Sequence, residues 1–212
     1  MYKKLHFDNP DVALPWHQQL VMRIYLGHFV AGSSVAEDNR KVYEAFSNKI
    51  IALASGIPFT LHSIRVLVPV QAGLLNDTRY WSIAMTLEHL IMIDKMAKEI
   101  IIRLALGQVP DLNVPVKSVA PTGKIEPEKV FEDYRLSVPL RLDEMDEAFI
   151  DSKCEVTAPH PIFGDFNARQ WQWSMAARSF LRHRQLQNIR KGLVFDPPAE
   201  RLISPPLESQ DV

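Results

Sequence analysis

The sequence predicts an all-α protein, a four-helix bundle built as a single domain. Long segments carry apolar residues every three or four positions, which is the period of a helix buried on one side. Glycine and proline gather between these segments, where helices end. The chain has 212 residues, of which 47% are hydrophobic, so it can bury one sizeable core. We expect this domain to span residues 1–194 and an irregular, proline-rich tail to span residues 195–212.

The first part of the chain predicts two helices. Residues 1–13 form an irregular lead-in, and residues 15–30 read as a first helix. Residues 37–55 read as a second helix, ended by glycine and proline just beyond it. Residues 57–76 are expected to be an irregular connector with one helical turn. The alternative is a strand at residues 64–68, but the surrounding helices offer it no obvious partner.

The clearest helix covers about residues 77–106, with Asp77 or Thr78 as its N-cap. Its large side chains advance by three or four residues and so share one face. That face consists of Trp81, Met85, His89, Met92, Met96 and Ile100. We expect this face to point into the core.

A long loop and two further helices follow. Residues 107–125 are too many for a tight turn, which predicts an up-down bundle with a long crossover. Residues 126–150 read as a helix that Pro139 must kink or break. Residues 151–167 read as a loop. Residues 168–190 read as the last helix, with Asn167 as its cap.

The composition indicates where the protein is located and which classes of partner it lacks. The net charge is −1, without the basic excess typical of nucleic-acid binders. Arg178 and Arg182 belong to the densest basic stretch, which reads as one polar helix face. The only cysteine is Cys154, which fits a reducing compartment. No apolar N-terminal segment or membrane span is visible, so a cytoplasmic protein without membrane contact is expected.

Two histidines stand on apolar helix faces. His89 belongs to the face described above. In the last helix the corresponding face consists of Trp173, Ala176, Phe180, His183 and Gln187. A buried imidazole needs a partner, and its lone pair suits Zn, Ni or Fe. The alternative is a pair of core histidines bonded to backbone carbonyls, tyrosine or water.

At this point the sequence resembles a known superfamily. Tyr80-Trp81-Ser82 followed by Leu87-Glu88-His89-Leu90 is similar to the second helix of the DinB-like, YfiT-like four-helix bundles. The stretches His160–Gly164, Trp171–Trp173 and Arg182–Gln187 are similar to later motifs of the same superfamily. The resemblance covers about residues 37–192.

The resemblance implies a metal held by three histidines, one on the second family helix and two on the last. By position His89 and His183 are two of these ligands. Ser179 or Phe180 stands where the third is expected, and neither replaces an imidazole. Gln187 at the following turn, Glu88 beside His89 and His160 from the loop are the alternatives for a third ligand.

The resemblance therefore leaves two functions open. The first is a metal-dependent enzyme of the thiol transferase or hydrolase type, using Zn or Ni to activate a thiol or water. The second is a bundle that binds a small molecule or forms a homodimer without a metal. Because one ligand is missing, we expect weak metal binding or none. No catalytic residue can be named, and the sequence does not decide between the two functions.

Overall fold

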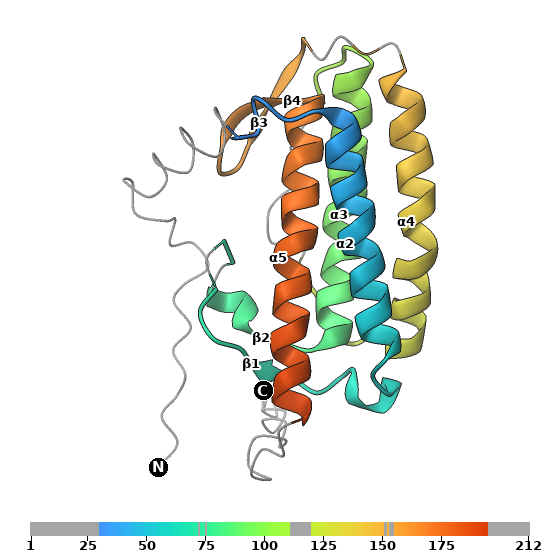
Figure 1. The fold of residues 1–212 in the computed structure, drawn as a ribbon, viewed down its shortest axis with the longest axis vertical. Helices are drawn as coiled ribbons and strands as arrows, with labels where there is room; N and C mark the ends of the chain where they lie inside the picture. The colour runs from blue at the N-terminus through green and yellow to red at the C-terminus, as the bar shows by residue number, and fades with distance from the viewer. Residues whose placement is uncertain are drawn as a thin grey trace, which may run out of the picture.

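The computed structural model describes residues 30–71, 73–74, 76–110, 120–150, 152 and 155–194. In these residues the chain is mostly helical, and four long helices pack side by side as a bundle (Figure 1). The helices are α2 (Ala36–Ser55), α3 (Ile83–Ala105), α4 (Pro127–Phe149) and α5 (Ala168–Val194). They confirm the predicted four-helix bundle. The predicted helix at 15–30 apart from Val30, the lead-in at 1–13, Cys154 and the tail at 195–212 lie outside the described residues.

The connectors contain short strands, where irregular loops were predicted. In the α2–α3 connector, β1 (Val66–Leu67) pairs antiparallel with β2 (Tyr80–Trp81). The 3-10 turn η2 (Phe59–Leu61) precedes β1, and the 3-10 turn η3 (Asn76–Arg79) lies between β1 and β2. The prediction of an irregular connector at residues 57–76 was thus wrong in part. The segment at 64–68 does have a strand partner, and that partner, β2, lies in residues that were predicted to belong to the next helix.

The α4–α5 connector is also more regular than predicted. Here β3 (Thr157–His160) and β4 (Gly164–Asn167) form an antiparallel hairpin within the expected loop at 151–167. Gly164 has a φ of 91°, a left-handed conformation that glycine adopts without strain, and it stands at the turn of this hairpin. The hairpin lies beside the first turn of α5 (Figure 1).

The order of the helices includes a long crossover. The contacts between α3 and α4 advance in the same direction along both helices. Asp94 faces Arg141, and one turn later Lys98 faces Glu144. These two helices are therefore parallel, and the chain must return along the bundle between them. The described part of that connector lies beside the first half of α3, where Thr122 and Gly123 contact Glu88. By the same reasoning α2 is parallel to α5 (Figure 1).

The start of α3 differs from the prediction. The helix begins after Ser82, whose hydroxyl accepts a hydrogen bond from the backbone N–H of Met85 at 3.2 Å. Asp77 and Thr78 lie in η3 instead of capping α3. The reason is the pairing of β2 with β1, which holds Tyr80 and Trp81 in an extended conformation.

The starts of α4 and α5 follow the sequence closely. Asn167 caps α5, because its Oδ1 accepts from the N–H of Gln170 at 3.0 Å. Gln170 returns the interaction by accepting from the N–H of Asn167, also at 3.0 Å. Pro127 occupies the first turn of α4, and the helix continues through Pro139 without a break.

The core-facing side of α3 matches the predicted face only in part, and that of α5 differs from it. Trp81, Met85 and Ile100 of the predicted α3 face are buried, whereas Met92 and Met96 are half-buried. The fully buried side of α3 advances by four and three residues, and it consists of Ile83, Leu87, Leu90, Asp94, Ala97, Ile101 and Leu104. His89 lies on the neighbouring, half-buried side. On α5 the predicted inward face is largely outward: Phe180 and Gln187 are exposed, and His183 is half-buried. Arg182, assigned to a polar outer face, is 5% exposed.

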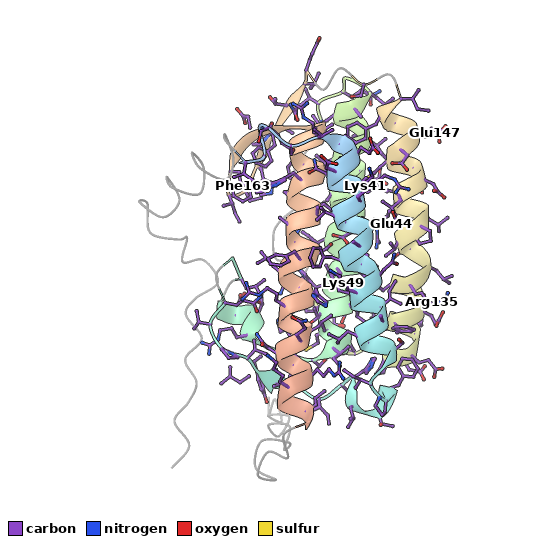
Figure 2. All side chains as sticks on the ribbon, in the orientation of Figure 1. Lys41, Glu44, Lys49, Arg135, Glu147 and Phe163 are labelled. Carbon is purple, nitrogen blue, oxygen red and sulfur yellow. The ribbon has the colours of Figure 1, made fainter. Side chains whose placement is uncertain are left out.

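The outer surface carries the charges. Figure 2 shows Lys41 and Glu44 on α2, and Arg135 and Glu147 on α4, at the outside of the bundle. Several of these groups form ion pairs within one helix, such as Lys41 with Glu37 at 2.6 Å. Exposed pairs of this kind contribute little to stability. None of the helices that the structure describes is long and apolar enough to cross a membrane.

Gly192, near the end of α5, provides a test of how the α2–α3 connector packs on the bundle. A Cβ at Gly192 would lie 2.4 Å from Cγ1 of Val66 in β1. We expect Gly192→Ala to lower the free energy of unfolding by about 1 kcal/mol, because overpacking outweighs the gain in helix propensity. Urea denaturation measures this difference.

Gly56→Ala is the matched control. Its Cβ would meet only backbone oxygens at 3.5 Å and 3.7 Å, and its φ is an ordinary −79°. It should leave stability unchanged or raise it slightly. Stabilisation by Gly192→Ala as well would show that β1 does not press on α5.

Candidate functional site

A buried polar cluster joins the four helices in the middle of the bundle. Asp94 of α3 is fully buried, and its Oδ2 accepts a hydrogen bond from the hydroxyl of Tyr43 on α2 at 3.1 Å. Arg141 of α4 donates from Nε to the same hydroxyl at 3.0 Å and places a second nitrogen 4.0 Å from Asp94. Arg178 of α5 donates to Oδ1 of Asp94 at 3.4 Å. Each helix thus contributes at least one side chain.

The electrostatics of this cluster follow from its burial. Burial raises the pKa of Asp94 more than the Arg141 and Arg178 guanidinium groups lower it. Burial also raises the pKa of Tyr43 far above its ordinary value, so the phenol stays protonated and can donate to Asp94. Burial likewise raises the pKa of Tyr134 of α4, which is also fully buried. Because its groups are buried and bonded to one another, the cluster is a structural network.

A second polar group lies on the seam between α3 and α5, one turn of α5 beyond Arg178. The guanidinium of Arg182 donates to Nε2 of His89 at 3.1 Å and to Oε1 of Gln185 at 2.6 Å. Its central carbon stands 4.6 Å from the ring centroid of Trp81, a cation–π contact. The ring of His89 also packs on Trp81, at 5.1 Å between centroids. Gln185 donates to the carbonyl of Thr78 at 2.6 Å, which ties the seam to η3.

The hydrogen bond between Arg182 and His89 fixes the state of the imidazole nitrogen. A guanidinium has only donors, so Nε2 of His89 must be the acceptor and uses its lone pair in this bond. Burial and the neighbouring Arg178 lower the pKa of Arg182 to about 9, which leaves it a cation at pH 7. The atom of His89 that faces α5 is therefore already bound to a positive charge.

The structure does not bring His183 and Gln187 to this seam. The ring of His183 packs on Phe46 of α2, with 5.7 Å between centroids. Since Arg182 and His183 are consecutive residues of a helix, their side chains point about 100° apart. Gln187 lies one turn further on the side of His183 and is exposed. At the position predicted for the missing ligand, the Ser179 hydroxyl donates to the Met175 carbonyl.

His160 and Glu88 also have other partners. Nδ1 of His160 accepts from the N–H groups of Ile162 and Phe163, at 3.2 Å and 3.4 Å, and its ring packs on Trp171. Trp171 precedes Arg182 by eleven residues, roughly 16 Å along the helix. The carboxylate of Glu88 accepts from the N–H groups of Thr122 and Gly123, both at 2.9 Å, and so holds the crossover against α3.

The side chains therefore do not fit the metal site that the three-histidine pattern implies. Within the described part of the chain, no three His, Cys, Asp or Glu side chains are grouped so that they could hold a metal ion. The nitrogen of His89 that would bind a metal is bonded to a cation. A surface pocket of about 280 Å³ occurs elsewhere, between the start of α2 and the end of α4, and its lining includes Arg40, Asp146 and Gln172 but no histidine.

Sequence reasoning missed most residues of this interior. Asp94 was predictable, because it continues the 4-3 spacing of Ile83, Leu87 and Leu90 on α3. Arg178 and Arg182 were noticed only as parts of a basic stretch. Since the inward side of α5 is polar at these positions, apolar content alone pointed to the wrong side of the helix.

Comparisons with known proteins give a partial structural likeness and no family. No protein-family model matches the chain, and no curated protein matches it. A solved structure that is similar in part is that of TT2238, described as a four-helix bundle protein. It is 19% identical, covers 72% of this chain and 98% of its own, and has a TM-score of 0.45. The fold assigned here rests on the helices of this chain themselves.

Replacing Asp94 tests the central cluster. Asp94→Asn keeps the shape but leaves Arg141 buried without a carboxylate, so we expect a loss of about 3–5 kcal/mol in the free energy of unfolding. The exposed Asp143→Asn on α4 is the control, with an expected change below about 0.5 kcal/mol. Replacing Asp94 and Arg141 together by leucine should cost less than the sum of the single leucine variants. Strict additivity would mean that the two groups do not interact.

His160 predicts a specific loss of stability in acid. Burial, with a smaller effect of Arg178, lowers its pKa from 6.5 to about 3, so the folded protein keeps this imidazole neutral. Below about pH 6.5 the unfolded chain takes up a proton that the folded chain does not, and stability falls until about pH 3. At pH 4.5 this amounts to roughly 2–3 kcal/mol relative to pH 7.

His160→Asn separates this effect from others, since the amide oxygen can accept the same backbone N–H bonds without titrating. Urea denaturation at pH 7 and pH 4.5 should show a smaller loss for the variant. His62, whose pKa is also lowered by burial, is present in both proteins and contributes equally. Equal losses in both would show that His160 is solvated in the folded protein.

Proposed function

We propose that this chain is a non-catalytic helical bundle that binds a small molecule at the α3–α5 seam and works without a metal. The observation that supports it is the 3.1 Å hydrogen bond from the Arg182 guanidinium to Nε2 of His89. The guanidinium supplies a fixed positive charge at the place where the DinB-like resemblance implies a metal ion. The small-molecule part of the proposal follows from the polar, partly accessible character of the seam, where His89 is half-buried.

A divalent ion at His89 would meet two obstacles. It would have to displace the guanidinium from Nε2, and it would then stand close to a buried positive charge. Two like unit charges 4 Å apart at the edge of a protein repel by about 4 kcal/mol, and a divalent ion doubles this. Zinc sites moreover use three or four protein ligands, whereas the seam offers the single imidazole of His89. The metal-dependent transferase or hydrolase is therefore the less supported alternative. The homodimer expected from the sequence stays a prediction.

Metal titration of the untagged protein tests the proposal. We expect no stoichiometric Zn or Ni after dialysis and only weak binding when either metal is added. Arg182→His should bind Zn at least tenfold more tightly, because it removes the positive charge and adds an imidazole on the α5 side of His89. Arg184→His, an exposed position on the same helix, is the control and should change little.

One result would overturn the metal-free proposal. Stoichiometric metal that survives dialysis of the unmodified protein, and is lost in His89→Ala, would show that the guanidinium yields its place to the ion. Elemental analysis of both proteins distinguishes this outcome. It would favour the metal-dependent alternative.

A further inference from the structure

The charges along the α3–α5 seam are not balanced by the side chains that touch them. Arg178 and Arg182 lie one turn apart on α5 and both face α3. Arg178 shares Asp94 with Arg141 and Tyr43. Arg182 forms no ion pair among the described residues: its contacts are an amide, an imidazole and an indole ring, all neutral. Its Nε is buried and has no hydrogen-bond partner.

The nearby acids do not supply the missing partner. Both carboxylate oxygens of Glu88 are used by the crossover, which donates to them from Thr122 and Gly123. Asp77 in η3 is near enough to favour the charged form of Arg182 electrostatically, but it makes no ion pair with it. A buried cation without a carboxylate is costly, and a bound anion would relieve that cost.

We propose that the α3–α5 seam binds one small monocarboxylate, which pairs with the guanidinium groups of Arg182 and Arg178 next to Trp81. This inference rests on the proposed function and specifies its ligand. Planar guanidinium groups bind carboxylates through paired N–H donors, and Arg182 has an N–H in reserve. Trp81 provides an apolar wall for the rest of the ligand. Access is provided by Arg178, whose side chain is 18% exposed, and by the half-buried His89.

A monoanion suits the site better than a more highly charged ligand. Asp94 already contacts Arg178, and Asp77 and Asp94 lie near enough to Arg182 to act on it electrostatically. Beside them a second negative charge on the ligand would be repelled and left unpaired. We therefore expect acetate and benzoate to bind and phosphate to bind less well.

The experiment measures the melting temperature, and then binding by calorimetry, with sodium acetate, benzoate, phosphate and chloride at constant ionic strength. For the unmodified protein we expect a saturable rise with the two carboxylates only. Arg182→Gln should weaken carboxylate binding at least tenfold. Arg184→Gln makes the same charge change at an exposed position of α5 and should bind normally. If Arg182→Gln does not fold, Arg178→Gln replaces it, with an expected weakening of at least threefold.

Several outcomes would overturn the inference. Equal shifts with all four salts, or equal shifts in Arg182→Gln and Arg184→Gln, would indicate a general salt effect. Binding of phosphate in preference to acetate would assign the seam to another class of anion. Carboxylate binding that disappears with a chelator and returns with Zn would overturn the metal-free proposal as well. If carboxylates fail to bind while the unmodified protein stays free of metal, only the ligand class is wrong.

Discussion

The buried carboxylate of Asp94 is the contact on which the arrangement of the four helices depends. It stands in the apolar stripe of α3 and is reached by Tyr43 of α2, Arg141 of α4 and Arg178 of α5. Apolar packing by itself tolerates small rotations of a helix, whereas a buried ion needs its partners in place. The Asp94 cluster therefore selects one rotation of each helix about its axis. That selection turns Arg178, and with it Arg182 one turn later, toward α3.

The position of Arg182 changes what the seam can do chemically. An imidazole on a bundle helix invites a metal, because bundle cores often build metal sites from facing helices. Here the imidazole of His89 accepts a hydrogen bond from a guanidinium instead. The cation of the seam is then the Arg182 guanidinium, which has a fixed geometry and, unlike a metal ion, no exchangeable coordination positions. Such a group can orient and neutralise an anion, but it cannot polarise a bound water as a Lewis acid does.

The connectors hold this seam from outside the bundle. Thr78 of η3 receives a hydrogen bond from Gln185, and Trp81 of β2 lies under the guanidinium of Arg182. Both residues belong to the segment that the pairing of β1 with β2 keeps out of helix α3. Toward the other end of α5, the ring of His160 packs against Phe163 of the hairpin and Trp171 of α5. The short strands thus decide which polar groups become buried at either end of α5.

The sequence alone determined where the long helices run, because their period and their end signals are local. Asn167 with Gln170, and Pro127 in the first turn of α4, mark helix starts through bonds and dihedral angles within a few residues. Only the tertiary structure decided which side of each helix faces the core. On α5 Phe180 points outward and Arg182 points inward, since the partners of Arg182, His89 and Trp81, come from about a hundred residues earlier in the chain. Pairing of distant groups, such as Val66 with Trp81 or Arg182 with His89, is a property of the folded chain, and no local pattern encodes it.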